Sequence, residues 1–270
     1  MTSPSDADAK CIQKLADQVA LVTGASRGIG RAIGLALATH GAAVVLTGRD
    51  VEALESARIE IRRDGGTCVA VAADLSERGG ARMVFDTAVS QLGRIDILVN
   101  NAGIGSSADP RPVVDYDDAF WELTLYVNLT VPYLLSKYAV APMIERGYGR
   151  IIQIASVAGK IGTFHGAAYS ASKHGLLGLT RSLAIETAGL GVTVNAICPG
   201  PVNTRTNDRH MAYHASRLDK PLAEYEAALT PIGRRLEPAE IASLAVYLAG
   251  PDAGAVTGQA YNIDGGVLMA

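Results

Sequence analysis

Apolar residues fall into short runs that alternate with longer segments in which apolar positions recur every three or four residues. The short runs predict buried strands, and the periodic segments predict helices. The predicted strands are Val19–Thr23, Ala43–Thr47, Thr67–Ala72, Ile95–Asn100, Arg150–Ser156, Val192–Cys198 and Gln259–Ile263. The predicted helices lie near residues 28–40, 50–64, 77–92, 117–146, 167–188 and 238–249. This alternation predicts an α/β fold with right-handed crossovers, in which a doubly wound parallel sheet of about seven strands is flanked by helices.

No linker, internal repeat or low-complexity segment interrupts the alternation, so residues 1–270 are predicted to form a single domain. Residues 1–16 are polar and form a predicted N-terminal extension. The loop Ile104–Asp115 and the stretch 203–235, which is rich in His and Arg, depart from the pattern. Ligands of such sheets bind beyond the carboxyl ends of the strands. Both segments are therefore predicted to border the substrate, and residues 203–235 are assigned as a substrate-side insertion.

The composition narrows the class of protein. Apolar residues make up 49% of the chain and charged residues 19%, and the formal net charge is −3. Without a basic patch, neither nucleic acid nor a membrane surface is an expected partner. The cysteines, Cys11, Cys68 and Cys198, have neither metal-binding nor disulfide spacing, which favours reduced thiols, no metal and a cytoplasmic location. The polar start of the chain does not match a signal peptide, and no apolar run is long enough to span a bilayer.

A glycine-rich turn follows the first predicted strand. Gly24, Gly28 and Gly30 lie where the strand gives way to a helix, in the run TGASRGIG. Such glycines allow a tight turn and let the backbone approach a pyrophosphate at the amino end of the helix. A plain strand-to-helix connection would also contain glycine, but the position after the first apolar strand favours dinucleotide binding.

The end of the second predicted strand indicates which dinucleotide binds. NAD-binding proteins usually place an acid there to accept hydrogen bonds from the ribose 2′-hydroxyl. This chain has Gly48 and Arg49 instead, and Arg27 lies within the glycine turn. Because an arginine pairs with a 2′-phosphate, the sequence predicts NADP(H) as the cofactor. Asp50 is adjacent, and a shift of one residue would let it contact the ribose of NAD.

A tyrosine and a lysine at helical spacing supply the candidate chemistry. Tyr169 and Lys173 are at positions i and i+4 of a predicted helix and therefore lie on one face. Ser156 ends a predicted strand, at the carboxyl edge of the sheet. A phenol can donate a proton to an alkoxide, and a nearby ammonium lowers the pKa of that phenol. Each residue alone is equally typical of a helix face, a solvated cation or a strand end.

In these features the sequence resembles the short-chain dehydrogenase/reductase family, in its compact single-domain branch. The resemblance extends from Val19 to Gly266 and includes TGASRGIG (23–30), DLS (74–76), NNAG (100–103), NLT (128–130), YSASK (169–173), PGPVNT (199–204) and IDGG (263–266). It implies a Rossmann-type fold, hydride transfer with a nicotinamide cofactor and a homotetramer. It also implies a catalytic tetrad: Asn128, Ser156, Tyr169 and Lys173. Asn128 would hold a water that links Lys173 to solvent.

The resemblance also implies the residues that contact the cofactor. Asp74 would contact adenine, Asn101 would fix the fourth strand near the cofactor, and Lys173 would bind the nicotinamide ribose. The implied set is Gly24, Ser26, Arg27, Gly28, Ile29, Gly30, Arg49, Asp74, Leu75, Asn101, Gly103, Tyr169, Lys173, Pro199, Gly200, Val202 and Thr204.

The YSASKHG run and the stretch 231–240 resemble NADPH-dependent ketoreductases of the 3-oxoacyl and polyketide type. The expected reaction is the reduction of a small-molecule ketone to a secondary alcohol. Fatty-acid-type members place an arginine at the end of the catalytic helix to bind a carrier protein. Residues 188–191 contain no base, which argues against a carrier-protein partner and favours a free, CoA-type or polyketide-like substrate.

Three alternatives differ in class or direction. The first is NAD-dependent oxidation of a small secondary or sugar alcohol. The second is a catalytically silent scaffold, and the third is an epimerase or dehydratase of the extended branch. The first alternative shares the same chemistry, so only cofactor preference and metabolite supply decide against it. The complete tetrad argues against the second, and the short chain and the form of the glycine turn argue against the third. The candidate residues of the substrate wall are Gly105, Ser106, Phe164, His165, Met211, Tyr213 and His214.

Overall fold

A seven-stranded parallel sheet forms the centre of the molecule, in the strand order β3-β2-β1-β4-β5-β6-β7. The computed structural model describes residues 13–269, so residues 1–12 of the predicted extension 1–16, with Cys11, lie outside the described residues. The strands are β1 (Val19–Thr23), β2 (Ala43–Gly48), β3 (Cys68–Ala72), β4 (Ile97–Asn100), β5 (Gly149–Ile154), β6 (Val192–Pro199) and β7 (Ala260–Ile263). The predicted doubly wound α/β fold is confirmed.

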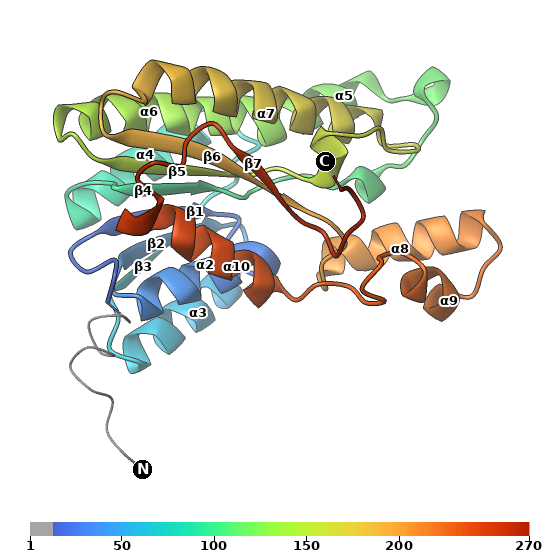
Figure 1. Cartoon of the computed structure of the whole chain (residues 1–270), viewed down its shortest axis with the longest axis horizontal. Coiled ribbons are helices and arrows are strands. Elements are labelled where there is room, and N and C mark those ends of the chain that lie inside the picture. The colour runs from blue at the N-terminus through green and yellow to red at the C-terminus, as the bar shows by residue number, and fades with distance from the viewer. Residues whose placement is uncertain (1–12, 270) are drawn as a thin grey trace, which may run out of the picture.

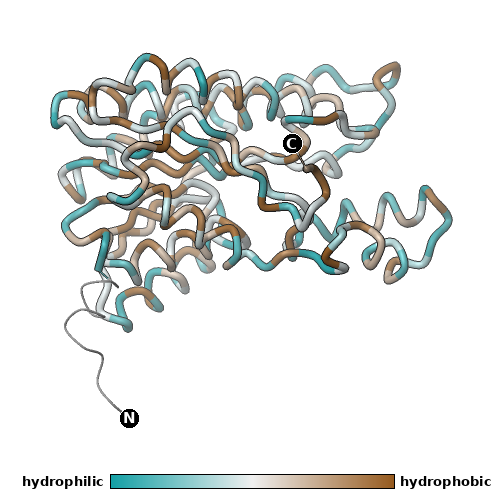
Figure 2. Tube along the Cα trace, in the orientation of Figure 1, coloured by the Kyte–Doolittle hydropathy of each residue, from teal (hydrophilic) through white to brown (hydrophobic). Residues whose placement is uncertain are grey.

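Helices cover both faces of this sheet (Figure 1). One face is covered by α2 (Gly28–Thr39), α3 (Val51–Arg63) and α10 (Pro238–Ala249). The other is covered by α4 (Gly80–Leu92), α6 (Val131–Glu145) and α7 (Ala167–Thr187). Because both faces are buried, the strands are almost continuously apolar, as the brown segments of the sheet show in Figure 2. Burial of this apolar surface is the main force that holds the layers together.

The strand order reverses beside β1, whose neighbours are β2 and β4. The crossovers that leave these strands run to opposite faces of the sheet, so a crevice opens at their carboxyl ends. Thr23, at the end of β1, and Asn100, at the end of β4, both lie at this edge. The fold therefore places the glycine turn beside the NNAG segment, although Thr23 and Asn101 are 78 residues apart in the sequence.

The predicted helix 117–146 is interrupted. The structure has α5 (Asp118–Leu125), a π turn over Tyr126–Thr130, and then α6. In the π turn the Val131 N–H donates to the Tyr126 carbonyl, five residues back. Apolar periodicity does not reveal one additional residue in a turn, so the pattern predicted a continuous helix. The predicted strand 150–156 also ends early, at Ile154, which places Ser156 just beyond the strand.

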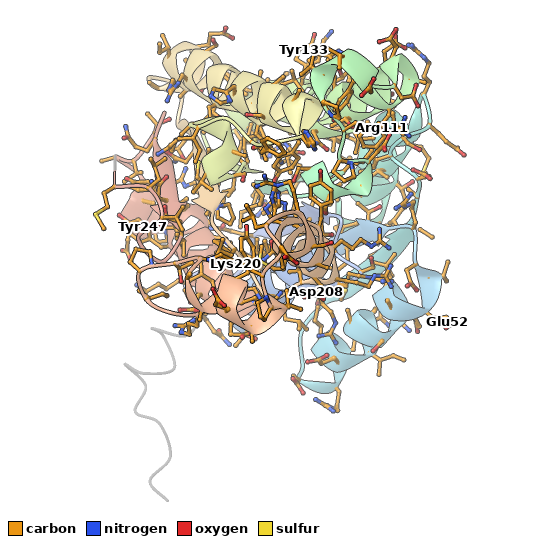
Figure 3. All side chains as sticks on the ribbon, turned by 90° about the vertical axis from the view of Figure 1, so that its right-hand side faces the viewer. Glu52, Arg111, Tyr133, Asp208, Lys220 and Tyr247 are labelled. Atoms are coloured by element: carbon orange, nitrogen blue, oxygen red, sulfur yellow. The ribbon has the colours of Figure 1, made fainter. Side chains whose placement is uncertain are left out.

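The substrate-side insertion is more regular than the sequence predicted. Within residues 203–235 the chain forms α8 (Arg205–Arg217) and α9 (Leu222–Ala227), which project from the body of the molecule beyond the carboxyl edge of the sheet (Figure 1). Thr204 begins α8, because its hydroxyl accepts a hydrogen bond from the Asn207 N–H at 3.3 Å. Figure 3 views the molecule from this side, with Asp208 on α8 and Lys220 between the two helices.

Candidate active site

The glycine turn brings the backbone of two strands into close approach. Gly24 has φ +63°, and a methyl group there would lie 2.8 Å from the Ala102 Cα. The Asn101 amide donates to the carbonyl oxygens of Thr23 (2.9 Å) and Gly24 (3.1 Å). The Thr23 hydroxyl accepts from the Asn101 (2.9 Å) and Ala102 (3.0 Å) N–H groups. These bonds fasten the turn to β4, as predicted for Asn101. Thr23 was not among the predicted site residues, although it opens the same motif.

The amino end of α2 is open to an anion. Its N-cap residue, Arg27, makes no side-chain cap, and the first turn contains no acidic residue. The first N–H groups of the helix therefore have no carboxylate to satisfy them, and the helix dipole adds positive potential. Thr204 lies over this turn, because a methyl group at Gly28 would be 3.2 Å from its Cγ2. These features fit the pyrophosphate of a dinucleotide.

Each of the two candidate phosphate-binding arginines pairs with an acid. Arg27 forms an ion pair with Asp50, and Arg49 lies 3.7 Å from Asp74. Asp50 also caps α3, where its carboxylate accepts from the Ala53 N–H at 3.0 Å. Asp50 is therefore engaged on the α3 side and is not free to replace the missing ribose-binding acid. Arg49 is 78% exposed and can turn toward a ligand at small cost.

Asp74 is held in its ionised form. Its carboxylate accepts from the Ser76 N–H at 2.9 Å and the Ser76 hydroxyl at 2.7 Å. These hydrogen bonds, with a smaller contribution from Arg49, lower the pKa of Asp74. A fixed anion at the end of β3 suits the predicted contact with the amino group of adenine.

Gly48 and Ser26 complete the cofactor cradle. A methyl group at Gly48 would lie 3.2 Å from the Ser26 hydroxyl, so the end of β2 lies directly against the glycine turn. Gly48 contributes no acidic side chain beside Arg27 and Arg49. The residues present therefore fit NADP(H), which would lie along the carboxyl edge of the sheet.

Replacing Gly30 by Ala tests the cradle. The added methyl group would collide with the Asn101 amide nitrogen and the Gly24 carbonyl oxygen, which hold each other in place. We expect the dissociation constant for NADPH, measured by fluorescence titration, to rise at least about tenfold, which corresponds to about 1.4 kcal/mol. Gly178→Ala on α7 is the control, because nothing lies within 4 Å of the added methyl group. That variant should bind NADPH normally, and equal weakening in both variants would contradict the assignment.

The side chain of Asn128 links three segments. It lies in the π turn and is fully buried. Its Oδ1 accepts from the Ile104 N–H at 2.7 Å, and its Nδ2 donates to the Ile104 carbonyl at 2.9 Å. Nδ2 also donates to the Ser172 hydroxyl at 3.1 Å, which in turn donates to the Tyr169 carbonyl at 2.7 Å. Asn128 is thereby joined to the helix that contains Tyr169. Sequence reasoning missed Ile104 and Ser172, although Ser172 lies within the YSASK motif.

Lys173 points into the site from α7 and is 5% exposed. Its ammonium donates to the Ile154 carbonyl at 2.7 Å and lies 5.7 Å from the centre of the Tyr169 ring. Burial lowers the pKa of Lys173 to about 8. The Ile154 carbonyl, at the end of β5, thus holds the lysine beside the tyrosine.

The pKa of Tyr169 differs from the expectation. Burial raises it, and a hydrogen bond with Ser156 opposes that effect. The expected lowering by the Lys173 ammonium is not seen, because burial disfavours charge on either group alone. The Ser156 hydroxyl accepts from the Ala158 N–H at 3.1 Å, so its own proton is available to an oxygen in the site. Ser156 and Lys173 thus lie beside Tyr169, and Asn128 is joined through Ser172 to the same helix.

The remaining predicted contacts lie around the same edge. Gly103 packs against Asn128, since a methyl group there would be 3.2 Å from Oδ1. Pro199 ends β6, and Gly200 packs closely against the Asp264 backbone. Val202 pairs with Leu236 in an isolated bridge, which anchors the start of the insertion. Leu75 follows β3 and is 5% exposed, and Ile29 packs against the core in the first turn of α2.

The residues predicted to form the substrate wall lie on two sides. The first side consists of Phe164, His165, Met211, Tyr213 and His214. Met211 and His214 are buried within the insertion, at 1% and 6% exposure. Phe164 is 53% exposed and lies under the Arg217 guanidinium, 4.0 Å from its ring centre. His165 hydrogen-bonds the Tyr213 hydroxyl and so joins the start of α7 to α8.

Gly105 and Ser106 belong to the other side of this wall. Ser106 begins the 3₁₀ turn η1 (Ser106–Ala108), which packs against α8. A methyl group at Gly105 would collide with Thr206 on that helix. The Ser106 hydroxyl lies 3.2 Å from the His210 Nδ1. Sequence reasoning missed His210, and only the packing of α8 on η1 reveals it.

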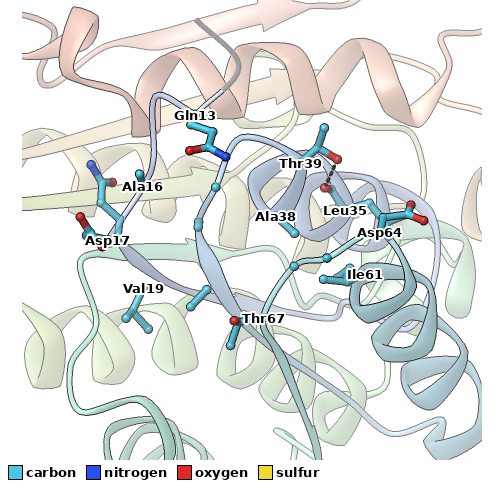
Figure 4. Close-up of a pocket in the computed structure, with 16 residues that line it drawn as sticks. Gln13, Ala16, Asp17, Val19, Leu35, Ala38, Thr39, Ile61, Asp64 and Thr67 are labelled. Carbon is cyan, nitrogen blue, oxygen red and sulfur yellow. Dashed lines mark hydrogen bonds between the residues drawn. The ribbon is translucent and has the colours of Figure 1, made fainter. Parts of the chain in front are cut away.

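A separate hollow of about 590 Å³ lies at the opposite edge of the sheet (Figure 4). Its lining includes Val19 and Ala43, the first residues of β1 and β2, together with Gln13, Asp17 and Thr67. The glycine turn and Tyr169 lie at the carboxyl edge instead. This hollow is therefore not the reaction site.

Among residues 13–269, no group of His, Cys, Asp or Glu side chains is arranged to hold a metal ion. In the same part of the chain, no helix is long and apolar enough to cross a membrane. Cys68 and Cys198 are buried free thiols.

Comparison with known proteins agrees with this geometry. A family model described as enoyl-(acyl carrier protein) reductase matches residues 24–268. The granaticin polyketide synthase putative ketoacyl reductase 1 of Streptomyces violaceoruber is 40% identical over 257 residues, which cover 93% of each chain. The chain therefore belongs to the short-chain dehydrogenase/reductase family of oxidoreductases, which confirms the resemblance seen in the sequence.

Two solved structures are similar over almost their whole length. A variant of actinorhodin polyketide ketoreductase with NADPH has a TM-score of 0.87 and 37% identity, over 93% of this chain and 97% of the other. A putative NAD(P)-dependent gluconate 5-dehydrogenase from Beutenbergia cavernae has a TM-score of 0.85 and 40% identity, over 95% and 98%.

Proposed function

We propose that this protein reduces a ketone to a secondary alcohol with NADPH, with Tyr169 as the proton donor. The proposal rests on one arrangement of hydrogen bonds. Asn128 is bonded to Ser172, Ser172 is bonded to the Tyr169 carbonyl, and Lys173 is held against the Ile154 carbonyl. The similarity to ketoacyl reductases and to an NADPH-bound ketoreductase bears out the predicted reaction class and cofactor.

Ser156 and Tyr169 would both form a hydrogen bond to the carbonyl oxygen of the substrate. When bound, NADPH supplies the hydride. The Ser156 hydroxyl would stabilise the developing negative charge on the oxygen, and the Tyr169 hydroxyl would donate the proton that completes the alcohol. Because the Ala158 N–H holds the Ser156 oxygen, the hydroxyl is pre-oriented for this role.

Lys173 would balance the charge that remains on Tyr169. Burial raises the pKa of Tyr169 and lowers that of Lys173. A phenolate and an ammonium formed together attract each other and so oppose both effects. A pKa of about 8 lets Lys173 take up a proton near neutral pH. Asn128, in the π turn, would hold the water through which that proton arrives from solvent.

The cofactor would be held by the residues of the cradle. Gly24, Ser26, Gly28, Ile29 and Gly30 would bind the pyrophosphate, and Arg27 and Arg49 would bind the 2′-phosphate. Asp74 and Leu75 would lie at the adenine. The residues toward the nicotinamide would be Asn101, Gly103, Pro199, Gly200, Val202 and Thr204.

The substrate is proposed to be a small molecule and not an acyl chain on a carrier protein. The last turn of α7 contains no basic residue that could bind an acidic carrier. A homotetramer in the cytoplasm is proposed as well. Leu123, Tyr133 and Ile185 expose apolar surface on α5, α6 and α7, which suits packing against further copies, and light scattering would measure the mass. The reduced thiols of Cys68 and Cys198 suit a reducing compartment.

A substrate panel tests the proposed reaction. Neutral ketones, 3-oxoacyl thioesters and gluconate are each assayed with both nicotinamide cofactors. We expect NADPH oxidation that depends on a ketone and is at least about tenfold more efficient than with NADH. Oxidation of gluconate with NAD⁺ and no ketone reduction would instead favour the alcohol dehydrogenase activity named for the Beutenbergia structure.

A further inference from the structure

Imidazole and phenol side chains gather where α8 meets the reaction side of the sheet. We call His165, His210, Tyr213 and His214 the histidine cluster. The ring centroids of His210 and His214 are 4.3 Å apart, and those of Tyr213 and His214 are 5.1 Å apart. His165 reaches this cluster through its hydrogen bond with the Tyr213 hydroxyl. The proposed mechanism uses none of these groups.

Ser106 connects the histidine cluster to the proposed catalytic residues. Its hydroxyl lies 3.2 Å from the His210 Nδ1. It is two residues from Ile104, whose backbone both donates to and accepts from the Asn128 side chain. Two residues span at most about 7 Å. The Ser106–His210 pair therefore lies close to Asn128, on the side toward the insertion.

The same pair lies near the start of the catalytic helix. A methyl group at Gly166 would be 2.9 Å from the Ser106 Cβ. Gly166 is the N-cap of α7, and Tyr169 lies in the first turn of that helix. Ser106 thus lies near the start of the helix that contains Tyr169 and contacts His210 on α8, so the pair faces the side from which a substrate would approach Tyr169.

This pair retains one hydrogen-bond donor in either tautomer of His210. If the Ser106 hydroxyl donates to Nδ1, the proton of the imidazole is on Nε2 and is free. If Nδ1 donates to Ser106, the hydroxyl proton is free. Nε2 makes no hydrogen bond to any of residues 13–269 and is not sealed from solvent. A ligand oxygen can therefore accept a hydrogen bond from this pair.

The donor that the pair offers is uncharged. Burial, with a smaller contribution from His214, lowers the pKa of His210 to about 4, so the imidazole is neutral at pH 7. Of the arginines on α8, Arg205 and Arg209 are exposed. Arg217 lies over the Phe164 ring, and Arg235 is paired with Asp208 and Glu226. A neutral donor binds a carbonyl or ester oxygen without compensating the charge of a carboxylate.

We propose that the Ser106–His210 pair binds a second, uncharged oxygen of the substrate and so selects 3-oxo esters and thioesters over 3-oxo acids. This inference rests on the proposed ketone reduction and names the substrate class of that site. A carboxylate placed against the pair would lose its water without gaining a cation, whereas an ester carbonyl would gain a hydrogen bond.

The test compares three ketones at saturating NADPH: ethyl 3-oxobutanoate, 3-oxobutanoate and 2-butanone. The wild-type protein should have a kcat/KM for the ester at least about tenfold above that for the acid. Ser106→Ala and His210→Phe should each lower kcat/KM for the ester about three- to tenfold, the range of one neutral hydrogen bond. Both should leave kcat/KM for 2-butanone within about twofold, because that ketone has no second oxygen.

His40→Phe is the matched control, since His40 ends α2 far from η1 and α8, and it should change none of the three values. His210→Arg should raise the ratio of acid to ester, because it introduces a cation. An equal loss for ester and 2-butanone in Ser106→Ala would overturn the inference, since the pair would then only support the fold. Equal wild-type efficiency for acid and ester would overturn it as well. Failure of the wild-type protein to reduce any ketone would instead reject the proposed function.

Discussion

Replacing Tyr169 by Phe is expected to lower kcat/KM for NADPH-dependent ketone reduction by about 10²–10⁴-fold, the usual contribution of a positioned general acid. Only the hydroxyl group is removed, and the ring that Lys173 faces remains. Loss of the hydroxyl also removes the hydrogen bond with Ser156. The measurement is the initial rate of NADPH oxidation with a neutral ketone.

Tyr133→Phe provides the matched control for this variant. Tyr133 is 44% exposed on α6 and points outward in Figure 3. The control should keep the activity of the wild-type protein. The melting temperature of Tyr169→Phe should stay close to that of the wild type, because the phenyl ring still fills the site. Unchanged activity in Tyr169→Phe would reject Tyr169 as the proton donor.

Arg49→Asp is expected to change the cofactor preference. The arginine is 78% exposed and has one distant acidic partner, so its loss should cost little stability. A charge-assisted contact with the 2′-phosphate contributes about 1.5–3 kcal/mol, and a new carboxylate adds repulsion. We therefore expect the ratio of kcat/KM with NADPH to that with NADH to fall by about 10–100-fold. Parallel titrations of both cofactors would show the same change in affinity.

Arg63→Asp separates a local contact from a change of net charge. Arg63 ends α3 and is 73% exposed beside Asp64. The Arg63→Asp substitution changes the net charge by the same amount as Arg49→Asp, but at the end of α3 and away from the glycine turn. The ratio of the two cofactors should stay the same in this variant. An unchanged ratio of kcat/KM with NADPH to that with NADH in Arg49→Asp would mean that Arg49 does not bind the 2′-phosphate.

The alternation of apolar runs was sufficient to predict the sheet, because parallel strands buried on both faces have an unmistakable apolar pattern. The helical spacing of Tyr169 and Lys173 likewise predicted that they share a face, and both lie on α7. Such predictions depend on contacts within one element. They need no knowledge of how distant segments pack.

Backbone partners could not be predicted in this way. The Ile104 peptide that fixes Asn128 and the Ile154 carbonyl that holds Lys173 carry no signal in their side chains. The Ser106–His210 contact joins residues 104 positions apart and depends on how α8 packs against η1. The pKa of Tyr169 was also misjudged, because the extent of burial is a property of the folded site.

The π turn over Tyr126–Thr130 also limits how this segment can change its length during evolution. One residue more than a regular helix needs is accommodated in the turn that contains Asn128. Deleting a single residue there would let α5 and α6 join as one regular helix and would rotate α6 by about 100° about its axis. Leu135, Ala139 and Met143, now buried against the sheet, would turn toward solvent. Related chains should therefore tolerate substitutions in this turn more readily than a change in its number of residues.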